Sequence, residues 1–298
     1  MNFFSKLLIR AKHKKLKKNP VIVCAEEEEI LKAVMDAFVE KVIESPILIG
    51  DSIKIIEILK KLTIDYSTIE IINSITKEEA SSLAIDLIIN KKADFLVKGL
   101  VDTSIILKAI LNKKEMFSQN KEIFFSHVAV AQLDNLNKII IFGDSAMNIL
   151  PNVNQKINIL ENCYLVAEKL KIKKPKIAII AAKEKVSEKM IATLDADIIT
   201  KKFSDDKRFI VEGPLALDNA LSEKASEIKG ITGKIKGDAD ILIMPNIETG
   251  NVFYKSLCYL TEAKIAGILV GASIPIVLTS RADSEESKFL SIVLASIM

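Results

Sequence analysis

The stretch Ile276-Val277-Leu278-Thr279-Ser280-Arg281-Ala282-Asp283-Ser284 joins an apolar strand to a serine, an arginine and an acid. Arg281 is one of only three arginines, and the other two, Arg10 and Arg208, lie in highly charged segments that we expect to be solvated. A guanidinium binds phosphate or carboxylate through paired hydrogen bonds that lysine cannot form. Since open α/β sheets place ligands beyond the carboxyl ends of strands, this stretch predicts an anion site.

A helix-capping turn is the alternative interpretation of the same stretch. Residues 285–297 predict a helix, which Asp283 or Ser284 can cap, and Arg281 would then form a surface ion pair. Both interpretations stay open on the local sequence.

Upstream of this stretch, short apolar runs alternate with helical patterns, which is the rhythm of βαβ units and predicts a mainly parallel sheet. The strand predicted near 95–97 ends in Lys98 and Gly99. Gly99 permits a close backbone approach, and the amides that follow can converge with Lys98 on an anion. An ordinary strand-to-helix turn with a solvated lysine fits equally well, because one glycine is not a phosphate-binding fingerprint.

Two apolar runs, 126–133 and 138–142, are separated only by a polar turn and predict an antiparallel hairpin. His127 lies in the first run without a Ser or Asp partner at an obvious spacing, so we interpret it as a structural histidine. The second run leads into a polar loop that contains Asp144.

A further strand, 241–244, ends in polar residues that begin a helix. Asn251 and Lys255 are four residues apart and therefore share one face of that helix. A ligand at the helix N-terminus could meet both an amide and an ammonium group there.

Composition narrows the class of protein. The 298 residues are 49% hydrophobic and carry 42 basic against 39 acidic side chains, a net charge of +3 that does not suit a nucleic-acid-binding face. The three cysteines are far apart and predict neither a disulfide framework nor a metal site, which fits a cytoplasmic protein. No apolar run reaches the ~18 residues of a membrane span, so we expect no membrane contact.

Length and pattern together predict two α/β domains. We place residues 1–137 and 285–298 in the first domain and residues 138–284 in the second. The chain would then cross between the domains twice.

Taken together, the strand ends resemble the phosphate acetyl/butyryltransferase family, and its butyryl branch in particular, over nearly the whole chain. The resemblance rests on six ordered segments, which are 98–103, 126–130, 213–218, 238–241, 245–251 and 278–284. It implies two domains with mainly parallel sheets flanked by helices, laid out as in isocitrate and isopropylmalate dehydrogenases, with the active-site cleft between them.

The resemblance also implies an activity. Family members transfer an acyl group between coenzyme A and inorganic phosphate without a metal, and coenzyme A is a substrate or product rather than a cofactor. The resemblance further implies a homo-oligomer. Carried over to this sequence, Ser280 and Arg281 would bind the phosphate, while the Asn251/Lys255 helix and the Lys98-Gly99 turn would line the cleft.

The thiol base is where this sequence departs from the family pattern. In the acetyl branch an aspartate stands seven residues beyond the serine, but here that position is Ser287. Asp283 and Glu286 are nearby candidates for the base, and each could instead cap the terminal helix. Asp144 is a third candidate, which we also place among the substrate-binding residues.

Three alternatives to butyryl transfer remain open on the sequence. The first is the same enzyme specialised for acetyl-CoA. The second is a dehydrogenase of the decarboxylating hydroxy-acid type, although no Gly-x-Gly-x-x-Gly turn occurs and the aspartates are scattered. The third is a non-catalytic protein that binds acyl-CoA, which Ser287 at the expected acid position motivates.

Overall fold

The computed structural model describes residues 2–118, 122–133, 138–279 and 283–298. They form two compact α/β units, one comprising Met1–Ile123 with Lys264–Met298 and the other comprising Phe124–Ala263. Ser280 and Arg281 lie outside the described residues, as does the polar turn 134–137.

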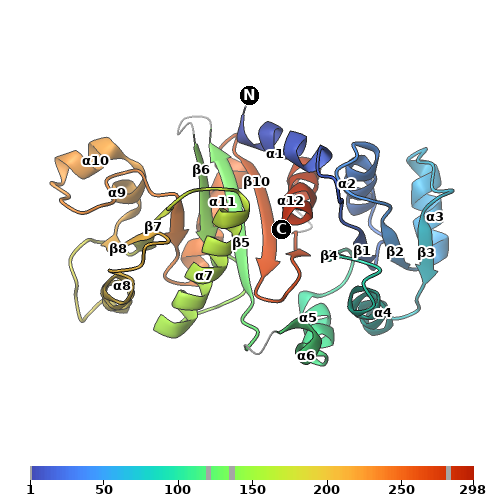
Figure 1. The fold of residues 1–298 in the computed structure, drawn as a ribbon, viewed down its shortest axis with the longest axis horizontal. Coiled ribbons are helices and arrows are strands. Elements are labelled where there is room, and N and C mark those ends of the chain that lie inside the picture. The colour runs from blue at the N-terminus through green and yellow to red at the C-terminus, as the bar shows by residue number, and fades with distance from the viewer. Residues whose placement is uncertain (1, 119–121, 134–137, 280–282) are drawn as a thin grey trace. The chain divides into compact units, whose positions relative to one another are not determined.

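The first unit is built on a sheet whose β3 edge is clear in Figure 1. Its strands are β1 (Pro20–Val23), β2 (Ile47–Gly50), β3 (Glu70–Asn73), β4 (Phe95–Lys98), β10 (Lys264–Val270) and β11 (Ile276–Val277), in the order β3-β2-β1-β4-β11-β10. They pair in parallel, except that β10 runs antiparallel to β11. The central strands β1 and β2 are buried throughout, which explains their continuous apolar sequence.

Helices cover both faces of this sheet (Figure 1). They are α1 (Phe3–Lys12), α2 (Glu28–Val39), α3 (Ser52–Lys61), α4 (Lys77–Ile89), α5 (Thr103–Leu111), α6 (Lys114–Phe117) and α12 (Glu285–Ile297). The helix pair α2 and α12 lies on one face, and the pair α4 and α5 lies on the opposite face. The terminal helix α12 packs within the first unit, where it contacts β10 and α2.

The second unit has the strand order β5-β6-β9-β7-β8. Its strands are β5 (Ser126–Leu133), β6 (Lys138–Gly143), β7 (Lys176–Ile180), β8 (Ile210–Leu215) and β9 (Ile241–Ile243), and its helices are α7 (Val153–Lys169), α8 (Ile191–Lys202), α9 (Leu217–Leu221), α10 (Glu223–Ile228) and α11 (Ile247–Leu260). The predicted antiparallel pair β5–β6 is present, and the other neighbours pair in parallel.

The compact units differ in their bounds from the domains expected from the sequence. The expected boundary at 137/138 falls within the β5–β6 hairpin, whereas backbone pairing from Ala129 with Phe142 to Leu133 with Lys138 keeps both strands in the second unit. Residues 264–284 belong to the first unit, because β11 pairs with β4 there.

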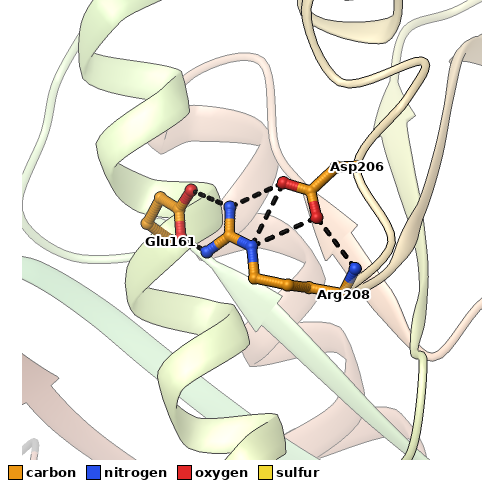
Figure 2. Close-up of polar contacts among 3 residues, drawn as sticks. All are labelled: Glu161, Asp206 and Arg208. Carbon is orange, nitrogen blue, oxygen red and sulfur yellow. Dashed lines mark hydrogen bonds and ion pairs between the residues drawn. The ribbon is translucent and has the colours of Figure 1, made fainter.

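Arg208 is exposed in its charged segment, as the sequence interpretation expects, and its guanidinium is paired there (Figure 2). Its guanidinium forms a bidentate pair with Glu161 of α7, with N–O distances of 2.8 and 2.9 Å. It also donates to Asp206, and its hydrogen bonds lower the pKa of that carboxyl. The planar group lies 4.7 Å from the ring centre of Phe209 and 5.2 Å from that of Tyr164. Arg208 therefore ties α7 to the segment that enters β8.

Candidate active site

The first group of predicted site residues lies at the carboxyl end of β4. Val23 of β1 is the register partner of Lys98, and the amide of Gly99 donates to the Val23 carbonyl at 2.9 Å. A Cβ atom at residue 99 would lie 2.1 Å from the Cys24 carbonyl oxygen. Only glycine fits that approach. The side chain of Lys98 is half-buried, and its ammonium lies 3.3 Å from the Gly99 carbonyl oxygen.

The register of β11 against β4 means that β11, the strand before Ser280 and Arg281, ends at the same edge of the sheet as Lys98. Ile276 pairs with Leu96 and Val277 with Val97, both in parallel, so both strands end at the same edge. Thr279 is the last described residue before the serine and arginine, and no geometry is assigned to Ser280 or Arg281. The described structure resumes at Asp283, which is half-buried.

Helix α12 begins at Glu285, two residues after Asp283, and Ser284 caps it. The Ser284 hydroxyl accepts a hydrogen bond from the Ser287 amide at 3.1 Å, so neither acidic candidate for the base provides the cap. Glu286 lies in the first turn, where it forms an ion pair with Lys264, and its side chain is 55% exposed. Glu286 is therefore a surface residue held in an ion pair.

The second group of predicted residues lies in the second unit and centres on Asp144. One carboxylate oxygen accepts hydrogen bonds from the amides of Ala146 and Met147, at 2.8 and 2.9 Å. The other accepts from the His127 amide at 3.1 Å and from the Asn148 side chain at 2.6 Å. With four donors and only 2% exposure, Asp144 has the contacts of a loop-organising residue.

His127 has a partner that the sequence analysis missed. Its Nδ1 lies 2.7 Å from the Ser145 hydroxyl, and its ring packs edge-on against Tyr254 with centroids 5.9 Å apart. Both His127 and Ser145 are buried. The eighteen-residue separation gives no local signal. Only the position of the loop after β6 beside β5 brings the two side chains together. This geometry agrees with a structural histidine.

Helix α11 is attached to the same loop by its N-terminal half. Asn246 caps the helix by accepting from the Thr249 amide at 2.9 Å, and the Asn251 side chain donates to the Ser145 carbonyl at 3.1 Å. A Cβ atom at Gly250 would lie 2.1 Å from the Asp144 carbonyl oxygen, so glycine is required there too. Lys255, one turn after Asn251, is exposed.

Lys98, Gly99, Asp283 and Glu286 therefore belong to the first unit, and Asp144, Asn251 and Lys255 belong to the second. Within the described ranges, no helix is long and apolar enough to cross a membrane. The same ranges contain no cluster of three or more His, Cys, Asp or Glu side chains placed to hold a metal ion.

The two units and the polar residues at their strand ends define an α/β protein with candidate anion-binding sites beyond its strands. Residues 68–296 match the family described as phosphate acetyl/butaryl transferase, and the chain belongs to that family. The resemblance inferred from the ordered strand-end segments is thereby confirmed.

Individual relatives match over nearly their whole length. The chain is 43% identical over 298 residues to a phosphate butyryltransferase from Clostridium acetobutylicum, covering 99% of this chain and 97% of that protein. It is 37% identical to a phosphate acetyltransferase from Thermotoga maritima, covering 99% of both chains. Among solved structures, a branched-chain phosphotransacylase from Enterococcus faecalis V583 superposes with a TM-score of 0.83 and 36% identity, covering 94% of this chain and 98% of that one.

Proposed function

We propose that this chain is an acyltransferase that reversibly moves a short-chain acyl group, with butyryl favoured, between coenzyme A and inorganic phosphate. The observation that carries the proposal is the 43% identity to a phosphate butyryltransferase across 97% of that protein's length. Shared family membership supports the same reaction type. Acyl-CoA and inorganic phosphate are therefore the proposed substrates in one direction, with coenzyme A as substrate or product and no separate cofactor or metal.

In the reverse direction, the sulfur of coenzyme A attacks the carbonyl carbon of an acyl phosphate. The bond between that carbon and the phosphate oxygen then breaks, and phosphate leaves with its electron pair. The site must accept the thiol proton, donate to the carbonyl oxygen and stabilise the leaving phosphate. We assign the last two roles to Arg281, with Ser280 as a second phosphate ligand.

The thiol base is assigned to Asp283 in preference to Glu286. Glu286 is on the surface and is paired with Lys264, whereas Asp283 is half-buried and lies two residues from Arg281 in the sequence. Asp144 is the weakest of the three candidates, because its two carboxylate oxygens already accept four hydrogen bonds. We propose that Asp144 does not contact the substrates and instead positions residues that do.

The substrate-binding residues complete the proposal. Lys98 and Gly99 provide a cation and a close backbone approach at the end of β4, and Asn251 and Lys255 provide polar groups on α11. We propose that these residues bind the substrates, and that the protein acts in the cytoplasm as a homo-oligomer.

A thiol-release assay tests the proposal. Purified protein is mixed with acetyl-CoA, butyryl-CoA or isobutyryl-CoA, with and without inorganic phosphate, and the free thiol is measured. We expect phosphate-dependent release that is fastest with butyryl-CoA. Faster release from acetyl-CoA would make the protein an acetyltransferase. Binding of acyl-CoA without any phosphate-dependent release would overturn catalysis in favour of a binding role.

A further inference from the structure

The first unit contains a topological switch point between β1 and β4. The chain passes from β1 to β2 and β3 on one side, and α4 then returns it to β4 on the other side of β1. Ligands of open α/β sheets bind beyond the carboxyl ends of the strands at such a point. Lys98 is the last residue of β4 and Gly99 follows it there, and Cys24-Ala25-Glu26 follows β1.

Glu26 is the unexplained residue at this edge. Its side chain is half-buried, and one of its carboxylate oxygens is covered from solvent without a hydrogen-bond partner among the described residues. The Glu26 carboxylate packs against the α-carbon of Gly50, the last residue of β2. A Cβ atom at residue 50 would lie 2.0 Å from Glu26 Oε2. The absence of a side chain at Gly50 thus makes room for this carboxylate.

The next three residues of the acidic run are all paired. Glu27 lies 3.7 Å from the Lys288 ammonium, Glu28 lies 2.6 Å from that of Lys61, and Glu29 also pairs with Lys288. These contacts give the run a structural role on α2 and before it. Glu26 stands apart from these pairs, since no described residue donates to its covered oxygen.

A buried acceptor without a donor destabilises the folded chain, and buried polar groups are satisfied in the great majority of cases. A bound ligand that supplies the missing donor removes this cost. The ligand group at this position cannot be anionic, because a phosphate group placed against a carboxylate would be repelled. A hydroxyl or an amide N–H fits, and coenzyme A carries both kinds of group.

We propose that Glu26 binds a neutral hydroxyl or amide donor of coenzyme A at the carboxyl ends of β1 and β2. The proposal rests on the proposed function and adds a residue to its binding site. Lys98, at the end of the adjoining strand β4, supplies positive charge for the anionic parts of the same ligand. Glu26 then orients the coenzyme by a charge-assisted hydrogen bond.

The test compares Glu26→Ala and Glu26→Gln with Glu28→Gln. The control removes the same charge from an exposed, ion-paired position two residues away. We expect the KM for coenzyme A to rise about 10- to 100-fold in Glu26→Ala and by a smaller factor in Glu26→Gln, which keeps one neutral acceptor. The KM for acyl phosphate and the control variant should change by less than about twofold.

Thermal unfolding without ligand separates this role from a structural one. If Glu26 binds the ligand, Glu26→Gln should unfold at the same temperature as the unmodified protein or higher. Residues that bind ligands often lower the stability of the protein without its ligand. A lower unfolding temperature together with an unchanged KM would overturn the proposal, as would an unchanged KM alone.

Calorimetric titration with coenzyme A keeps the two proposals distinguishable. If the unmodified protein binds coenzyme A without transferring acyl groups, the proposed function fails, and the dissociation constants of the variants still test Glu26. If the unmodified protein turns over and Glu26→Ala shows the same KM, only the role of Glu26 is overturned.

Discussion

The amide of His127 donates a hydrogen bond to the Asp144 carboxylate over 3.1 Å, which joins the start of β5 to the loop after β6. The same loop carries the Ser145 carbonyl oxygen that accepts from Asn251 of α11. Asp144 therefore acts on α11 through backbone and side-chain contacts of its own unit. If α11 binds substrate as proposed, Asp144 acts on that surface through these contacts without lining it.

Asp144→Asn should destabilise the chain by about 2–3 kcal/mol, because an amide NH₂ replaces an oxygen that accepts two hydrogen bonds. A fall of several degrees in the unfolding temperature would be the measured effect, with exposed Asp65→Asn as the control. If Asp144 only positions the loop, the residual activity should keep the pH profile of the unmodified enzyme. Loss of one limb of that profile would instead identify Asp144 as the base.

Asp283→Asn should reduce acyl transfer by about 100-fold or more, as expected for removal of a general base, whereas Glu286→Gln should stay within about twofold of normal. The difference follows from the surface ion pair of Glu286 with Lys264. Rates measured from pH 6 to 9 check both variants. Full activity and an unchanged pH profile in Asp283→Asn would reject its assignment as the base.

Arg281→Lys should lower turnover by about one to two decades, because lysine keeps the charge and loses the paired hydrogen bonds that are worth about 1.5–3 kcal/mol. The circular dichroism spectrum should be unchanged. Arg10→Lys makes the same exchange in α1 and should turn over normally. Near-normal kinetics in Arg281→Lys would remove the anion-binding role.

Asp195→Asn should cost about 3–5 kcal/mol in unfolding free energy, because it leaves the Lys156 ammonium buried without its partner 2.6 Å away. Side-chain exposures of 5% and 11% make this pair the internal link of α7 to α8. Denaturant unfolding measures the change. Asp197→Asn on the same helix removes a pair whose lysine is 75% exposed, and it should cost less than about 1 kcal/mol. Equal losses in the two variants would contradict the argument.

Cys24 should resist alkylation near neutral pH. Burial, followed by the charge of Glu26, raises the pKa of its thiol to about 11. Its thiolate fraction, and hence its reaction rate, should rise with pH up to that value. Glu26→Gln should move the rise to lower pH. Iodoacetamide labelling followed by mass spectrometry resolves each cysteine, and Cys258, which is less buried, should react first. Equal rates at Cys24 and Cys258 at pH 8 would contradict this prediction.

The sequence by itself determined the alternation of strands and helices and the residues at the strand ends. Lys98, at the end of β4, and the β5–β6 hairpin were predicted because apolar periodicity and turn residues act over short distances along the chain. The ordered strand-end segments also sufficed to indicate the family.

Only the tertiary structure decided which distant side chains meet. Ser145 beside His127, Gly50 beneath Glu26, and Glu161 against Arg208 depend on the order of strands in a sheet and the packing of helices on it. Local patterns do not specify that order, because side-chain periodicity reports which face of an element is buried and not which element covers it. The roles of Asp144 as a loop organiser and of Glu286 as a surface ion-pair partner emerged for the same reason.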